Sequence, residues 1–104
     1  MIYHVIISEA AEMDMKEIAG YISDELNSPQ AALDLMYEIQ RQILELRQMP
    51  KRFALVTNDE LANRGIHLIP IKNYLVFYVV DEQTKTVNIV RIIYGRRDWI
   101  SLLR

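Results

Sequence analysis

Residues 74–94 read YLVFYVVDEQTKTVNIVRIIY, and the arrangement of the whole chain follows from this run. Tyr74 to Val80 is almost entirely apolar or aromatic, which predicts a central strand covered on both faces. The polar run from Asp81 to Thr86 is typical of a hairpin connection, and residues 87–94 are predicted to return as the next strand. Because residues 74–80 need cover on both faces, this strand is predicted to lie in the centre of the sheet.

Two amphipathic helices are predicted upstream of this hairpin. Apolar residues recur at steps of three and four residues along 11–26 and again along 32–46. Ser28 suits the N-cap of the second helix and Pro29 suits its first position, while Pro50 lies just beyond its end. The connection between the helices is short, and this predicts an antiparallel helical hairpin.

The remaining segments complete an α+β prediction. Residues 2–7 are β-branched and aromatic and are predicted to form a strand, and residues 66–71 form another, which Pro70 places at a sheet edge. Residues 51–65 form a loop with room for one helical turn, and residues after Gly95 have room for a short C-terminal helix. The order β-α-α-β-β-β predicts a helical hairpin packed on one face of a mostly antiparallel sheet of about four strands.

Length and composition narrow the class of protein. The 104 residues suit a single domain, 1–104, and 51% hydrophobic with 25% charged residues is typical of a soluble globular chain. No run approaches the ~20 apolar residues of a membrane span, and the N-terminus lacks the basic region of a signal peptide, so we expect a cytoplasmic protein without a membrane partner. Without cysteine and with only two histidines, we expect no metal site and no cofactor.

Charge is unevenly distributed along the chain. Residues 1–40 hold eight acids against one lysine, a net charge of −7, whereas residues 41–104 hold six acids against eleven bases, a net charge of +5. Glu12, Asp14 and Glu17 lie off the apolar stripe of the first helix, which predicts an acidic, solvent-exposed face. The two halves are either two solvated faces of opposite sign or surfaces for a partner.

No phosphate-binding, dinucleotide-binding or zinc-protease motif occurs in the sequence, so a candidate site can be inferred only from individual residues. Strict alternation along the last strand places Arg91 on the same face as Val87, Ile89 and Ile93. An arginine in that position must either pair with an acid or line a cleft, because an unpaired buried charge is very costly. His67 is either a general base or a structural histidine in its strand.

A cluster at the end of the chain is the strongest candidate for a site. Tyr94, Arg96, Arg97 and Trp99 follow the last strand closely, and arginine and aromatic side chains are the types that dominate phosphate contacts and protein interfaces. The alternative is structural: Arg97 pairs with an acid and Trp99 fills the core.

The chain resembles the ParE/RelE toxin superfamily of bacterial type II toxin–antitoxin systems, over essentially its whole length and with ParE as the nearer branch. The resemblance rests on Ser8-Glu-Ala-Ala, Ser28-Pro29, Met49-Pro50, Lys72-Asn-Tyr-Leu-Val-Phe-Tyr-Val-Val-Asp81 and, above all, Ile89-Val-Arg-Ile-Ile-Tyr-Gly-Arg-Arg-Asp98. It implies a cytoplasmic toxin that inhibits growth, serves plasmid stabilisation in some systems, and is neutralised by a cognate antitoxin.

The superfamily divides by target, and Leu75 bears on that division. RelE-like members cut mRNA on the ribosome and usually carry an arginine after the aromatic residue that opens the central strand, a position that Leu75 occupies here. They also tend to carry a tyrosine or histidine near the very end, where this sequence has Ser101-Leu-Leu-Arg104. ParE-like members poison DNA gyrase. The resemblance therefore favours a gyrase-directed toxin that is not an enzyme. From their position after the last strand, we expect Tyr94, Arg96, Arg97 and Trp99 to bind the target.

Two alternatives stay open at this point. The chain could be a ribosome-dependent mRNA endoribonuclease, in which Arg91, Arg97, Tyr94 and His67 form a rearranged catalytic site. It could instead be a non-toxic module that only binds an antitoxin.

Overall fold

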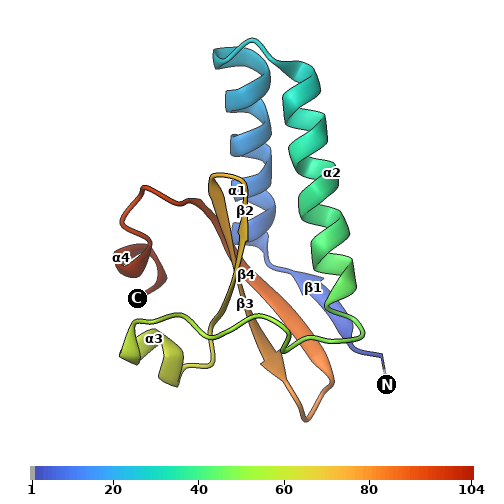
Figure 1. Cartoon of the computed structure of the whole chain (residues 1–104), viewed down its shortest axis with the longest axis vertical. Coiled ribbons are helices and arrows are strands. Elements are labelled where there is room, and N and C mark those ends of the chain that lie inside the picture. Colours follow the sequence, from blue (N-terminus) through green and yellow to red (C-terminus); the bar gives the residue numbers. More distant parts are fainter. Residues whose placement is uncertain (1) are drawn as a thin grey trace.

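The computed structural model describes residues 2–104, and its elements follow the predicted order. They are β1 (His4–Ile7), α1 (Glu9–Gly20), the π-helical segment η1 (Tyr21–Glu25), α2 (Pro29–Glu45), α3 (Asp59–Asn63), β2 (His67–Ile71), β3 (Tyr74–Asp81), β4 (Thr86–Tyr94) and α4 (Trp99–Leu103). The α+β architecture, with a helical hairpin beside a sheet, is confirmed (Figure 1).

The sheet has four strands in the order β1-β4-β3-β2. β3 pairs antiparallel with both β2 and β4, whereas β1 runs parallel to β4, with His4 opposite Thr86 and Ile7 opposite Ile89. β2 is an edge strand, as Pro70 predicts, because proline cannot donate a ladder hydrogen bond. The mostly antiparallel sheet of four strands is therefore confirmed, with one parallel pair.

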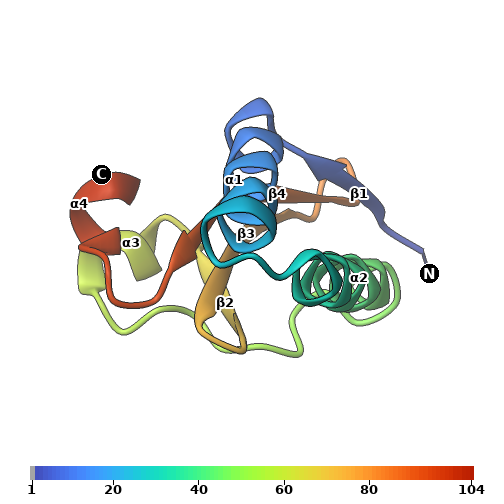
Figure 2. The same cartoon turned by 90° about the horizontal axis from the view of Figure 1, so that it is seen from above.

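The two long helices begin as their sequences suggest, with one difference. The Ser8 side chain caps α1 by accepting a hydrogen bond from the Ala11 amide at 3.0 Å. α2 begins at Pro29, but the Ser28 side chain makes no capping hydrogen bond, and the Ser28 carbonyl accepts from the Ala32 amide instead. α1 and α2 lie side by side and extend past the strands (Figures 1 and 2). Among the helices of residues 2–104, none is both long enough and apolar enough to cross a membrane.

The central strand β3 separates two apolar cores. Val76 and Tyr78 point into the core beneath α1 and α2, where they meet Ile39 of α2. Phe77, between them, points into a second core with Leu61 of α3. All five side chains are fully buried. The prediction that this strand is covered on both faces is correct, and α3, α4 and the segment before β2 supply the second cover.

Strict alternation along β4 was a wrong expectation because the strand contains a β-bulge. Phe77 lies opposite Arg91 and Tyr78 lies opposite Ile89, so Val90 is an extra residue in the ladder. One extra residue reverses the faces beyond it. Ile89 belongs to the core beneath the helices, whereas Ile93 belongs to the second core.

Asp14 also differs from its expected place on the exposed acidic face of the first helix. It is buried, and its carboxylate accepts hydrogen bonds from Arg91 Nε at 2.7 Å and Arg91 Nη2 at 2.9 Å. It accepts a third from the Ile92 amide at 2.9 Å. The ion pair raises the pKa of the Arg91 guanidinium above its usual value. Of the two expectations for Arg91, pairing with an acid is the one the structure realises.

We expect Asp14→Ala to destabilise the fold by about 3 kcal/mol, because it leaves the Arg91 charge and the Ile92 amide without their partner. Asp24→Ala is the matched control, since Asp24 is an exposed acid farther along the same hairpin, and it should change stability by less than about 0.5 kcal/mol. Urea unfolding of both variants measures the difference. Equal stability of the two variants would show that the Asp14 contacts contribute nothing to the fold.

Candidate functional site

A groove of about 630 Å³ lies where the tip of the helical hairpin meets one end of the sheet. Side chains of α1, η1 and α2 form one wall, and the β2–β3 turn and the end of β4 form the other. Its lining is mixed. Apolar groups such as Ile18 and Leu35 lie beside three tyrosines, Tyr21, Tyr74 and Tyr94, and beside the charged groups Glu17, Lys72 and Arg97.

The hairpin tip has an irregular backbone that places Tyr21 and Leu26 at the groove. α1 widens into the π-helical segment η1, where the Leu26 amide donates to the Tyr21 carbonyl at 3.1 Å. Asn27 then takes a φ of 53°, in the left-handed region that asparagine tolerates better than most residues, and the chain turns into α2. Tyr21 is 53% exposed and Leu26 is 56% exposed, so both present apolar surface at the open end of the groove.

The opposite wall is held together by a close approach between two turns. The Gly95 amide donates to the Asn73 carbonyl at 2.8 Å, and a Cβ at Gly95 would lie only 3.2 Å from that oxygen. Glycine therefore lets the segment after β4 pack against the β2–β3 turn. Lys72 precedes Asn73 with a φ of 53°, and Arg97 follows Gly95 by two residues. The contact brings both cations to the same groove.

Tyr74 and Tyr94 lie side by side on this wall of the groove. They lie opposite each other in the β3–β4 ladder, and their rings meet edge to face with centroids 5.6 Å apart. Burial raises the pKa of Tyr74 above its usual value, and the neighbouring phenols of Tyr94 and Tyr21 act in the same direction. Its hydroxyl therefore stays protonated at neutral pH.

The structure brings together only part of the predicted target-binding cluster. Tyr94 and Arg97 line the groove together, whereas Arg96 is exposed and is not among the lining residues. Trp99 is half-buried, and its ring packs against Phe77 with centroids 5.3 Å apart. Trp99 thus belongs to the second core, as the structural alternative proposed for it.

The four residues of the alternative RNA-cleaving site are not gathered in one place. Arg91 is paired with Asp14. His67 lies opposite Tyr78 in the sheet, whereas Tyr94 lies opposite Tyr74, four residues away along β3, or roughly 13 Å. Tyr94 and Arg97 therefore share the groove without the other two.

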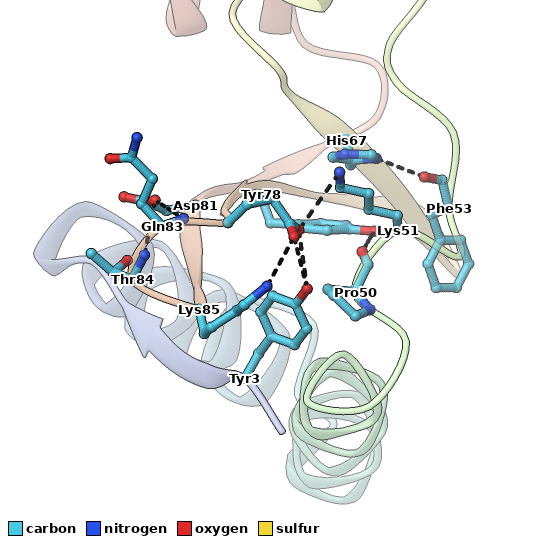
Figure 3. A network of polar contacts seen from close by, with 11 residues as sticks. Tyr3, Pro50, Lys51, Phe53, His67, Tyr78, Asp81, Gln83, Thr84 and Lys85 are labelled. Atoms are coloured by element: carbon cyan, nitrogen blue, oxygen red, sulfur yellow. Dashed lines mark hydrogen bonds and ion pairs between the residues drawn. The ribbon is translucent and has the colours of Figure 1, made fainter. Parts of the chain in front are cut away.

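His67 is buried in a structural contact (Figure 3). Its Nδ1 lies 2.7 Å from the Phe53 carbonyl oxygen, and its ring stacks on the Tyr78 ring with centroids 4.9 Å apart. The Tyr78 hydroxyl donates to the Pro50 carbonyl at 2.7 Å, and burial raises the pKa of Tyr78 to about 12. These contacts fasten the segment after α2 to the sheet. Within residues 2–104 no group of three or more His, Asp or Glu side chains is placed to hold a metal ion.

A second polar network, also drawn in Figure 3, joins the N-terminal segment to the β3–β4 turn. The Tyr3 hydroxyl donates to the Glu82 carboxylate at 3.0 Å, and Lys85 Nζ lies 3.3 Å from Oε2 of the same carboxylate. The hydrogen bond from Tyr3 is the main reason that the pKa of Glu82 is lowered. The network is exposed, so it adds little stability, and it lies away from the groove.

Sequence reasoning did not identify Lys72, Tyr74, Tyr21 and Glu17 as neighbours of Tyr94 and Arg97. They come from a turn, a strand and the hairpin tip, so no spacing in the sequence connects them. Gly95 was the available signal, because a glycine directly after a strand often permits the close approach of another backbone segment.

Solved structures of low identity share this fold. The structure of this chain is similar to that of the chromosomal ParDE toxin–antitoxin system of P. aeruginosa, with TM-score 0.72 and 19% identity over 89% of this chain and 96% of that one. This chain is also similar to a mutant of the E. coli toxin RelE in the free state, with TM-score 0.68 and 11% identity over 98% of this chain and 93% of the RelE chain. The RelBE2 toxin–antitoxin complex of Mycobacterium tuberculosis matches with TM-score 0.63 and 17% identity over 90% and 99%. The fold is thus that of small toxins of toxin–antitoxin systems.

A family model gives the assignment within this class. The model described as the ParE toxin of the type II toxin-antitoxin system parDE matches residues 5–99. No curated protein sequence gives a significant match. Because the family model spans nearly the whole chain, this protein belongs to the ParE toxin family of type II toxin–antitoxin systems. The resemblance drawn from the sequence is confirmed.

Alkaline titration tests the burial of Tyr78. An unfolded tyrosine loses its proton near pH 10 and the folded Tyr78 near pH 12. Its neutral form is favoured in the fold, so this contribution to stability is complete below pH 10 and is lost as the pH rises towards 12. Tyr78→Phe should cost about 1 kcal/mol at pH 7, through the lost hydrogen bond to Pro50, and should remove this part of the alkaline loss.

Urea unfolding at pH 7 and at pH 11 measures both effects. Tyr37→Phe is the control, since Tyr37 is 70% exposed and should behave as the wild-type protein does. Identical alkaline losses in Tyr78→Phe and the wild-type protein would contradict the buried environment of this hydroxyl.

Proposed function

We propose that this toxin inhibits bacterial growth by poisoning DNA gyrase, that it acts in the cytoplasm and that a cognate antitoxin neutralises it. Family membership supplies the class, a toxin of a type II toxin–antitoxin system. The gyrase target rests on the chemistry of the groove, which suits binding better than RNA cleavage. The proposal of an antitoxin partner rests on family membership and on the similar solved structures, which come from toxin–antitoxin systems.

The observation that carries the gyrase proposal is the set of titratable groups in the groove. Cleavage of RNA through its 2′-hydroxyl needs a base with a pKa near neutrality. Histidine is absent from the residues that line the groove, and burial raises the pKa of Tyr74, so its hydroxyl stays protonated. Lys72 and Arg97 can bind an anion, but the lining offers no histidine to accept the 2′ proton.

Leu75 supports the same conclusion. RelE-like chains usually carry an arginine at this position, but here the side chain packs against the second core cluster. It lies near Gly95, at 3.7 Å from the position that a Cβ there would occupy. The position contributes packing, so a positive charge for a cleavage transition state is missing from it.

The second candidate function is mRNA cleavage on the ribosome. The observation in its favour is that Arg97, Lys72 and Tyr94 share one groove, where two cations could stabilise charge on a scissile phosphate. The third candidate, a non-toxic antitoxin-binding module, would use the same surface for binding alone. One induction experiment separates the three.

Induction in a bacterium that lacks the antitoxin should lower plasmid supercoiling and trigger the DNA-damage response before protein synthesis falls. The purified toxin should also inhibit supercoiling by purified gyrase. Primer extension on translated messages is expected to show no new ends. Codon-periodic cleavage of these messages would establish the nuclease, and normal growth at full expression would establish the non-toxic module.

Arg96→Ala should stay folded and lose growth inhibition while it still binds antitoxin. Its side chain is exposed and makes no hydrogen bond or ion pair within residues 2–104, so its loss should change stability by less than about 0.5 kcal/mol. An arginine anchor at an interface is typically worth about 2 kcal/mol of binding. Thermal melts and growth assays measure the two effects.

Trp99 needs a separate control because its ring supports the fold. Trp99→Ala should cost about 2 kcal/mol of stability through lost packing on Phe77, whereas Trp99→Phe keeps an aromatic ring there. A folded double variant, Arg96→Ala with Trp99→Phe, that remains fully toxic would move the target surface away from this segment and towards the acidic hairpin.

A further inference from the structure

Two cations at the groove lack a partner among the described residues. Lys72 and Arg97 are both exposed, and neither makes a side-chain hydrogen bond or an ion pair within residues 2–104. Several other cations of the chain do form ion pairs, for example Arg41 with Glu38 and Arg52 with Glu45. The hydrogen bond from Gly95 to Asn73 fixes the two backbone segments from which Lys72 and Arg97 extend. The groove therefore presents two cations that form no ion pair within residues 2–104, with the Glu17 carboxylate on the opposite wall.

Beside these charges lies a large apolar and phenolic surface. Tyr21 and Leu26 are each more than half exposed at the hairpin tip, and Tyr74 and Tyr94 line the same groove as the two cations. Tyrosine rings bury much area at a low entropic cost, and they dominate protein-binding surfaces for that reason. The surface therefore suits an apolar side chain inserted next to an acidic one.

The opposite wall argues against a nucleic-acid strand. Glu17 lines the groove itself, and Asp24, Glu25 and Asp34 are exposed on the same hairpin. A strand of phosphates needs a track of several cations, because each phosphate contact releases counter-ions and adds to the affinity. Two cations that face an acidic hairpin favour a single carboxylate over a run of phosphates.

We propose that the groove receives a segment of the target protein that carries apolar side chains and one carboxylate. The apolar side chains insert among Tyr21, Leu26 and Tyr74, and the carboxylate binds Lys72 and Arg97. The inference rests on the proposed function, since the target protein is gyrase there, and it adds the chemistry of the segment that gyrase contributes.

Charge reversal at Lys72 tests the carboxylate. Lys72→Glu should weaken inhibition of gyrase supercoiling at least tenfold, whereas Lys72→Arg should keep it within about twofold, because a charged pair that is reversed becomes a repulsion. Arg47→Glu is the matched control: Arg47 is an exposed cation outside the groove with no ion pair within residues 2–104. It should inhibit as the wild-type toxin does, and circular dichroism verifies that all three variants are folded.

Photocrosslinking tests the occupant directly. Tyr21→p-benzoylphenylalanine should crosslink to a gyrase subunit when irradiated with purified gyrase and DNA, and the captured peptide should contain Asp or Glu beside apolar residues. The same substitution at Tyr37, which is exposed on α2 outside the groove, should not crosslink. Capture of DNA, capture of a peptide without a carboxylate, or capture from position 37 alone would overturn the proposal.

The outcomes separate this inference from the proposed function. If the wild-type toxin leaves gyrase uninhibited, the gyrase target fails and the inference fails with it. If the wild-type toxin and Lys72→Glu inhibit gyrase equally, the function stands and the groove proposal is wrong. If Lys72→Glu keeps inhibition but escapes neutralisation by the antitoxin, the groove belongs to the antitoxin, which also overturns the proposal.

Discussion

The carboxylate of Asp14 holds the helical hairpin on the sheet. β1 pairs with β4 only as far as Ile7, and the helix that follows continues to occupy that edge of β4. The Ser8 amide donates to the Ile89 carbonyl and its hydroxyl donates to the Val90 carbonyl, each at 3.0 Å. Asp14 then accepts the Ile92 amide and both Arg91 contacts. Side chains of α1 thus replace a strand where the strand ends, and the buried edge of β4 keeps its hydrogen bonds.

This joint also sets the geometry of the groove. Glu17 and Tyr21 follow Asp14 by three and seven residues, so they lie on the same side of α1 and its π-helical extension. Fixing Asp14 against Ile92 therefore brings these two side chains towards Tyr94, two residues farther along β4. The bulge at Val90 contributes by directing Ile92 towards the helices and Ile93 towards the second core. A partly buried ion pair, a bulge and the position of the groove are thus parts of one arrangement.

Local patterns in the sequence were sufficient for the elements but not for their contacts. The apolar run of β3 predicts its burial on both faces, Pro70 predicts the sheet edge, and Pro29 predicts the start of α2. Asp14 looked like its exposed acidic neighbours, because a helix period says which residues leave the apolar stripe but not which of them meets a charge on a distant strand. The bulge carries no glycine or proline signal. The groove unites residues 17–35, 72–74 and 94–97, which only the tertiary fold brings together.

Hydrogen exchange at the Ile92 amide tests this account most directly. On this edge of β4 the amide has no strand partner and is bound by the Asp14 side chain. If that bond is part of the cooperative core, the Ile92 amide exchanges only through global unfolding, with the same free energy of opening as the Phe77 amide in the central strand. Exchange of Ile92 through a local opening, several kcal/mol easier than global unfolding, would contradict the claim that Asp14 replaces the strand and fixes the hairpin.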